Sequence, residues 1–316
     1  MLPGKLLMHI PDGFLNIPVS LVLWVVSIIV IAIALRKTSR QLGEKEIPLM
    51  GILAAAIFAG QMLNFSVTGG TSGHLLGAAL ATILLGPWAA ILVMTSVVSV
   101  QALVFQDGGL IALGANLFNM AVVGVFISYA AITLIKKIIR NERTSLFVGG
   151  TVSAWFSILF ASLACALELA LSGTSPANIA IPAMASIHAL IGVGEALITL
   201  GAVSFIFAAR KDLLKAGKSE KATNKGILIG GGLITIILAV LSPLASSHPD
   251  GLEWVAEKQG FLSVARDSIY NLIPDYVMPG LSNETVATII AGILGVVIVF
   301  VLALGLAQTR KKPVRD

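Results

Sequence analysis

The chain has 316 residues, of which 57% are hydrophobic and only 12% charged, and its formal net charge is +5. Soluble domains carry about 25% charged residues, so a soluble protein of this composition could not cover its surface with polar side chains. The single cysteine, Cys165, excludes a disulfide framework and a thiolate metal cluster built within one chain.

Apolar runs long enough to cross a bilayer, about 20 residues each, recur from one end of the chain to the other. We expect spanning helices over Ile17–Leu35, Pro48–Phe65, Pro87–Val104, Leu113–Ile135, Leu146–Leu171, Ile179–Ala209, Gly226–Leu244 and Val286–Ala307. A shorter run, His74–Leu85, ends at Gly86-Pro87. We interpret it as a ninth helix, joined to the next by a tight turn.

The basic residues decide between eight helices and nine. Most of the 21 Lys and Arg residues lie in four clusters, Arg36–Lys45, Lys136–Arg143, Arg210–Lys225 and Arg310–Arg315. Cytoplasmic loops of membrane proteins carry this excess. Nine helices place all four clusters in the cytoplasm, whereas eight place the first cluster opposite the others. The basic charge is then explained by topology and requires no nucleic-acid partner.

The predicted fold class is therefore an all-α integral membrane protein with nine transmembrane helices, an outer N-terminus and a cytoplasmic C-terminus. A seven-helix bundle spans residues 8–209, and a basic cytoplasmic linker spans 210–225. A two-helix hairpin follows over 226–316, around an acidic outer loop, Ala245–Thr285. The acidity of this loop would raise the local concentration of cations.

Met8 and His9 carry specific metal chemistry if the chain begins at Met8. The amine of Met8, the deprotonated amide nitrogen of His9 and the His9 imidazole close two fused chelate rings, and one further imidazole completes a planar set of four nitrogens. Such ligation suits Ni(II) and Cu(II) and fits tetrahedral Zn(II) poorly. A histidine near the chain start without any role is the equally weighted alternative.

A second polar segment, Asn64–His74, is rich in glycine and hydroxyl residues and lies between two predicted helices. Irregular backbone at membrane depth occurs only where it is buried in protein or lines a cavity. His74 can supply the fourth nitrogen, although a capping or core histidine is as compatible with the spacing.

Several segments resemble the substrate-capture subunit of nickel and cobalt transporters of the energy-coupling factor class. They are MHIPDGFL (8–15), GGTSGHLLGA (69–78), QALVFQDGGL (101–110), LGAN (113–116) and HALIGVGEAL (188–197). The segment SHPDGLE (247–253) resembles the small two-helix auxiliary subunit of the same systems, fused here to the capture subunit. Within the family, the opening MHIPDG is similar to the nickel members.

The resemblance implies that Met8, His9 and His74 bind Ni²⁺ or Co²⁺ as the transported substrate, with no bound cofactor. It also implies a prokaryotic cell membrane, a transmembrane coupling protein and two cytoplasmic ATPases, because the chain has no Walker A motif and is not itself an enzyme. The alternatives are a cobalt importer that supplies cobalamin biosynthesis and a stand-alone secondary metal transporter. Since Met1–Leu7 precede Met8, we expect translation to start at Met8 or the extension to be removed.

The remaining polar residues have two interpretations each. Five are expected either to hydrogen-bond the metal loop or to join helices, namely Asn64, Ser66, Ser72, Gln101 and Asn116. His188 and Glu195 share one helix face and can line the pocket or brace the bundle, and we favour bracing. Of the others, Asp107 is interpreted as a turn residue, Glu168 as reaching water and His248 as a surface histidine.

Overall fold

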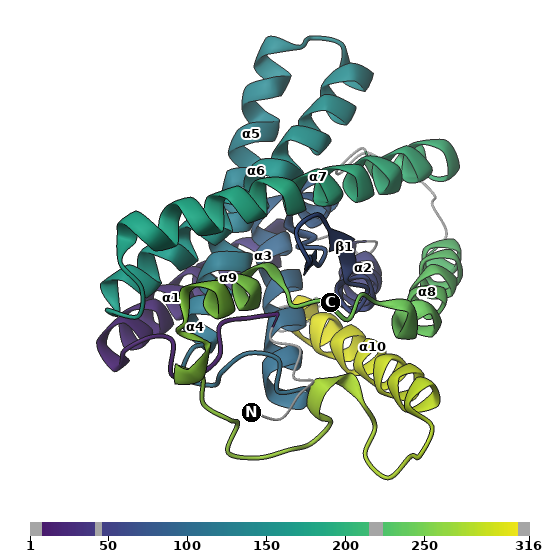
Figure 1. The fold of residues 1–316 in the computed structure, drawn as a ribbon. Helices are drawn as coiled ribbons and strands as arrows, with labels where there is room; N and C mark the ends of the chain where they lie inside the picture. The colour runs from purple at the N-terminus through teal and green to yellow at the C-terminus, as the bar shows by residue number, and fades with distance from the viewer. Residues whose placement is uncertain (1–7, 42–45, 215–223, 309–316) are drawn as a thin grey trace.

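The computed structural model describes residues 8–41, 46–214 and 224–308 (Figure 1). Within these ranges seven helices are long and apolar enough to cross a membrane, and a shorter apolar helix accompanies them. The prediction of a helical, multi-pass membrane protein is confirmed, while the orientation of its termini stays a prediction. The extension Met1–Leu7 and part of the predicted linker, 215–223, lie outside the described residues.

The elements follow one another along the chain with one small hairpin among the helices. They are α1 (Ile17–Gln41), α2 (Glu46–Gln61), β1 (Phe65–Val67), β2 (Thr71–Gly73), α3 (Ala78–Val104), α4 (Leu113–Leu117), the π-helical η1 (Phe118–Val123), α5 (Gly124–Ile138), α6 (Glu142–Leu171), α7 (Ala177–Ala209), η2 (Lys211–Leu214), α8 (Asn224–Leu241), η3 (Ser242–Leu244), α9 (Gly251–Gln259), η4 (Leu262–Val264), η5 (Pro274–Tyr276) and α10 (Glu284–Gln308).

The short predicted helix His74–Leu85 begins later than expected, because α3 starts at Ala78 and leaves His74 outside the helix. The predicted break at Gly86-Pro87 is present: Gly86 has φ 75° and ψ 171°, a conformation that interrupts the helix. Only glycine adopts such a conformation readily. A second difference is the π-helical turn η1 inside the predicted helix Leu113–Ile135.

The helices form layers in which the C-terminal hairpin packs on the bundle. Figure 1 shows α5 and α6 side by side at the top, with α7 packed along α6. Helices α8 and α10 lie beside α2, and α10 also contacts α3. Several small residues of α2, among them Ala54, Ala55 and Ala59, are buried at these helix contacts.

The segment between α8 and α10, residues 245–283, is called the auxiliary loop below. It is not a free outer loop, because its main chain is hydrogen-bonded to the bundle. Ser72 N donates to Pro249 O at 2.8 Å, and a parallel bridge joins Ser72 to Asp250. Arg266 N donates to Asp12 O at 2.7 Å. The auxiliary loop therefore lies over the two segments that sequence reasoning assigned to metal binding.

Candidate metal site

The N-terminal segment that carries Met8 and His9 is fixed by two polar side chains. The Asp12 carboxylate accepts the main-chain N–H groups of residues 110–112 at 2.9–3.1 Å. The Asn116 side chain accepts from Ile10 N at 3.0 Å and donates to Ile10 O at 3.1 Å. These bonds hold the segment against the 107–116 region and leave His9 buried. Asn116 thus positions the N-terminal segment.

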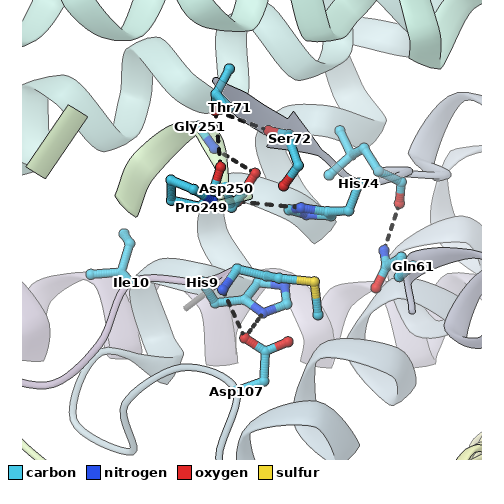
Figure 2. A network of polar contacts seen from close by, with 12 residues as sticks. His9, Ile10, Gln61, Thr71, Ser72, His74, Asp107, Pro249, Asp250 and Gly251 are labelled. Atoms are coloured by element: carbon cyan, nitrogen blue, oxygen red, sulfur yellow. Dashed lines mark hydrogen bonds and ion pairs between the residues drawn. The ribbon is translucent and has the colours of Figure 1, made fainter. Parts of the chain in front are cut away.

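Two of the three nitrogen donors of the predicted chelate converge on one carboxylate oxygen. Oδ1 of Asp107 lies 3.2 Å from Met8 N and 2.9 Å from His9 Nδ1 (Figure 2). Two fused chelate rings likewise require these two nitrogens to face one point. Asp107 lies in the turn after α3, as expected, and its buried side chain in addition contacts both predicted ligands.

The opposite oxygen of Asp107 binds the auxiliary loop. The Tyr276 hydroxyl donates to Oδ2 at 2.6 Å, and the Tyr276 ring stacks on Phe105 with centroids 4.7 Å apart. Burial raises the pKa of Asp107, but the electrostatic attraction of His9 and the hydrogen bonds from His9 and Tyr276 outweigh it. The net result is a pKa below the ordinary value, so the carboxylate stays ionised.

His74 follows the hairpin of β1 and β2, whose turn residues Gly69 and Gly70 have φ values of 94° and 79°. The hairpin places the His74 ring centroid 5.6 Å from that of His9. Metal–imidazole bonds are about 2.0–2.1 Å long, so a single ion between the two rings is within reach of both. The structure therefore brings all three predicted ligands, Met8, His9 and His74, to one place.

The backbone after His74 is held from two other helices. Both carboxylate oxygens of Glu195 on α7 accept main-chain N–H groups, from Leu76 at 2.6 Å and from Gly77 at 2.9 Å. Gln61 Nε2 at the end of α2 donates to Leu76 O at 2.9 Å. Glu195 thus braces the bundle, as favoured from sequence, and the backbone it fixes begins two residues after His74.

The auxiliary loop supplies a carboxylate to His74. Oδ2 of Asp250 lies 3.4 Å from His74 Nδ1 (Figure 2), and both side chains are largely buried. Burial lowers the pKa of His74, but the negative charge of Asp250 and its hydrogen bond more than offset this, so the pKa is raised. A carboxylate on Nδ1 orients the ring and leaves Nε2 for another partner.

A cavity of about 70 Å³ connects these groups. Its walls include Met8, His9, His74 and Asp250, and further along Asn119, Cys165, Met184 and His188. Across the described ranges of the chain, no three His, Cys, Asp or Glu side chains cluster closely enough to hold a metal ion. A metal site here needs donors besides these side chains, and the proposed set of Met8, His9 and His74 supplies main-chain nitrogen.

The other predicted polar residues have different partners from those expected. Asn64, Ser66 and Ser72 bind the auxiliary loop: Asn64 O accepts from Ser246 N at 2.8 Å, Ser66 Oγ donates to Ser246 Oγ at 3.1 Å, and Ser72 Oγ donates to His248 O at 2.8 Å. Gln101 is buried, and its main-chain carbonyl accepts from Asp107 N at 3.1 Å.

Two further expectations concern single charged or titratable side chains. His248 is exposed, as expected, and its Nδ1 lies 3.1 Å from Ser246 Oγ. Glu168 does not reach water: it is buried and accepts from Asn119 Nδ2 at 2.8 Å. The expectation for Glu168 was wrong because α6 continues to Leu171 and packs against η1 at this level.

Sequence reasoning missed Asp250 and Tyr276 as parts of the site and underrated Asp107. The motif Pro249-Asp250-Gly251 was used only for the resemblance to the auxiliary subunit, and its carboxylate was given no role. Nothing in the sequence indicated which part of the bundle the motif contacts.

Comparison with known proteins gives two family matches that divide the chain. The model of the cobalt uptake substrate-specific transmembrane region matches residues 9–213, and the model of the PDGLE domain matches residues 225–312. A protein of Archaeoglobus fulgidus named as a candidate fused nickel transport protein, NikMN, is 40% identical over 306 residues, 96% of this chain and 98% of that protein.

Other relatives are named for nickel and for cobalt. The fused nickel transport protein NikMN of Rhodobacter capsulatus is 31% identical over 79% of this chain and 76% of its own length. The cobalt transport protein CbiM of Sorangium cellulosum is 32% identical over 66% of this chain and 94% of its own length. A crystal structure of a truncated transition metal transporter matches with a TM-score of 0.57 and 37% identity, over 64% of this chain and 99% of that one.

Proposed function

Because the chain belongs to the cobalt uptake substrate-specific transmembrane family and carries a PDGLE domain, we propose that it captures Ni²⁺ or Co²⁺ at the outer face of the cell membrane. It delivers the ion across the membrane as the substrate-specific subunit of an energy-coupling factor importer. The predicted topology, with the N-terminus outside and the basic clusters in the cytoplasm, places His9 and the His74 hairpin on the outer side.

The observation that carries the proposal is the meeting of Met8, His9 and His74 at one cavity. The donor set is the Met8 amine, the amide nitrogen and imidazole of His9, and the imidazole of His74. A free amine at Met8 is a condition of this set, because a peptide nitrogen in that position is a far poorer ligand. Four nitrogens in a plane favour Ni(II) among the ions that such importers meet.

Energy for transport comes from partners in this proposal. The sequence contains no Walker A motif, so a transmembrane coupling protein and two cytoplasmic ATPases are the expected partners. A cobalt importer that supplies cobalamin biosynthesis is the second candidate, favoured by relatives named for cobalt transport. Uptake by this chain alone, without ATPases, would instead support a stand-alone secondary transporter.

The first test is the metal content of the purified full chain after exposure to Ni²⁺ or Co²⁺, measured by elemental analysis. We expect tight binding in the wild type and a large loss in His74→Ala, with His248→Ala as the control for removal of an exposed histidine. Equal metal in the wild type and His74→Ala would remove His74 from the site.

Intact-mass analysis of the same preparation identifies the first residue. Tight nickel binding by protein that retains Met1 would overturn the amine of Met8 as a ligand, without removing His9 or His74. The metal content of the variants therefore tests His74, and the intact mass tests the amine of Met8.

A further inference from the structure

His188 is a buried imidazole whose two ring nitrogens have different environments. Nδ1 lies 2.8 Å from the main-chain carbonyl of Met184, one turn earlier on α7, and is satisfied by donating its proton there. Nε2 makes no hydrogen bond to any residue that the structure describes, and the side chain lines the same cavity as His9 and His74. Glu195, on the same face of α7, braces the backbone instead, so the two residues do not share one role.

This arrangement is the one that metal-binding histidines adopt. A ligating histidine donates its second ring N–H to a carboxylate or a backbone carbonyl, which sets the tautomer and leaves the other nitrogen with a free lone pair. A histidine that only joined helices would be expected to use both nitrogens, because an unpaired polar atom within a membrane protein is costly. The lone pair of His188 Nε2 is therefore unused by the fold.

The auxiliary loop connects His188 to the outer ligands. The Cα of Gly251 lies so close to His188 that a Cβ added there would be 3.1 Å from Nε2. The preceding residue, Asp250, has its carboxylate 3.4 Å from Nδ1 of His74. Consecutive residues of the auxiliary loop thus contact both imidazoles, and one cavity is shared by them.

We propose that His188 forms a second metal position in this cavity. Its Nε2 binds the divalent ion, Ni²⁺ or Co²⁺, when the ion leaves the set formed by Met8, His9 and His74. The Asp250 carboxylate lies along this path and offsets the charge of the ion, and water completes the coordination. A position of transfer needs fewer protein ligands than a position of storage, since a strongly held ion would not move on. This inference rests on the proposed function.

The nickel binding that remains after loss of His74 distinguishes the two metal positions, the one at His9 and His74 and the one at His188. The full chain in detergent is titrated with Ni²⁺ in three variants: His74→Ala, the double variant His74→Ala/His188→Ala, and the control double variant His74→Ala/His248→Ala. We expect His74→Ala to retain weaker binding, which the second substitution at His188 removes and the one at His248 leaves. Identical titrations of His74→Ala and the His188 double variant would overturn the proposal.

Transport gives the second measurement. In the complete complex, His188→Ala in an otherwise wild-type chain is expected to keep the tight nickel affinity within about twofold and to slow uptake about tenfold or more, the range found when groups that support a metal ligand are lost. Full uptake by this variant would also overturn the proposal. His188→Gln, whose thermal unfolding without metal is compared with that of the wild type, separates loss of the ligand from loss of folding.

The failures of the two proposals are distinguishable. A wild-type chain that binds neither Ni²⁺ nor Co²⁺ refutes the proposed function and this inference with it. Tight wild-type binding that depends on His74, together with full uptake by His188→Ala, refutes the inference alone.

Discussion

The carboxylate of Asp250 lies 3.4 Å from Nδ1 of His74, so a residue of the PDGLE segment contacts an imidazole of the seven-helix bundle. Tyr276, also in the auxiliary loop, donates a hydrogen bond to Asp107, which in turn contacts Met8 and His9. Both halves of the candidate metal site are therefore in contact with the C-terminal hairpin. Fusion of the two units in one chain keeps these contacts intramolecular.

Replacement of Asp250 by Asn is expected to weaken nickel binding about 10- to 100-fold, the usual cost of removing a group that orients a metal-binding histidine. The amide keeps the size of the carboxylate but loses the charge that holds His74 Nδ1. Affinity is measured by titration of the full chain. Glu257→Gln is the matched control, because Glu257 is an exposed carboxylate on α9, the helix that Asp250 caps. Equal losses in both variants would mean that only the overall charge of the loop matters.

Replacement of Glu195 by Ala is expected to leave the N–H groups of Leu76 and Gly77 buried without acceptors. Each such group costs about 1–3 kcal/mol of unfolding free energy, so the melting temperature should fall markedly. Glu195→Gln keeps one acceptor oxygen, so its melting temperature should fall less.

Nickel affinity should fall in the same order, because Glu195 fixes the backbone two and three residues after His74. Thr199→Val is the control on the same helix, since the buried Thr199 hydroxyl has no hydrogen-bond partner among the described residues. A normal affinity in a folded Glu195→Ala protein would show that the brace does not position His74.

The spanning helices could be predicted because each depends on a local property, a continuous apolar run. The break at Gly86 was also predictable from local sequence, because Gly-Pro restricts the backbone at that point. The start of α3 was not, because it is decided by a distant residue. Glu195 accepts the N–H groups of Leu76 and Gly77, and Gly77 has φ 80°, so the helix begins only at Ala78.

The candidate site likewise has residues that local sequence predicts and contacts that it does not predict. His9 and His74 were found from their types and their local sequence. The contacts of Asp107, Asp250 and Tyr276 join segments far apart in the chain, and no local pattern indicates which segment a carboxylate will face. Asp250 is an example: its main-chain neighbours pair with Ser72, and this pairing, rather than the PDGLE motif itself, brings the carboxylate to His74.

Acid unfolding of the metal-free chain tests the environment of Asp107. Its pKa is lower in the folded protein than the ordinary value of about 3.9, so the unfolded state takes up the proton first as the pH falls. The stability that the carboxylate contributes is present above about pH 4 and is lost as the pH falls through the folded pKa.

We therefore expect the wild type to melt at a higher temperature than Asp107→Asn between about pH 5 and pH 7, and the difference to shrink below about pH 4. Thermal unfolding at a series of pH values measures both curves. A difference that grows on acidification would mean that the pKa of Asp107 is raised instead.

Replacement of Gly251 by Ala narrows the passage between the two imidazoles without altering a ligand. The added Cβ would lie 2.7 Å from Cδ1 of Ile191 and 3.1 Å from Nε2 of His188, so these side chains must shift. Overpacking of this kind costs about 1–3 kcal/mol, and part of the strain should move the His188 ring. Gly230→Ala on α8 is the control, because a Cβ there meets no atom within 4 Å.

We expect Gly251→Ala to keep tight nickel binding within about threefold and to slow uptake by the complete complex about tenfold, the scale of effects on groups beside a metal ligand. Gly230→Ala should match the wild type in both measurements. Because Gly251 has no side chain to bind metal, slow uptake with normal capture would locate the defect after the ion has reached His9 and His74. Normal uptake by a folded Gly251→Ala protein would show instead that the ion does not pass His188.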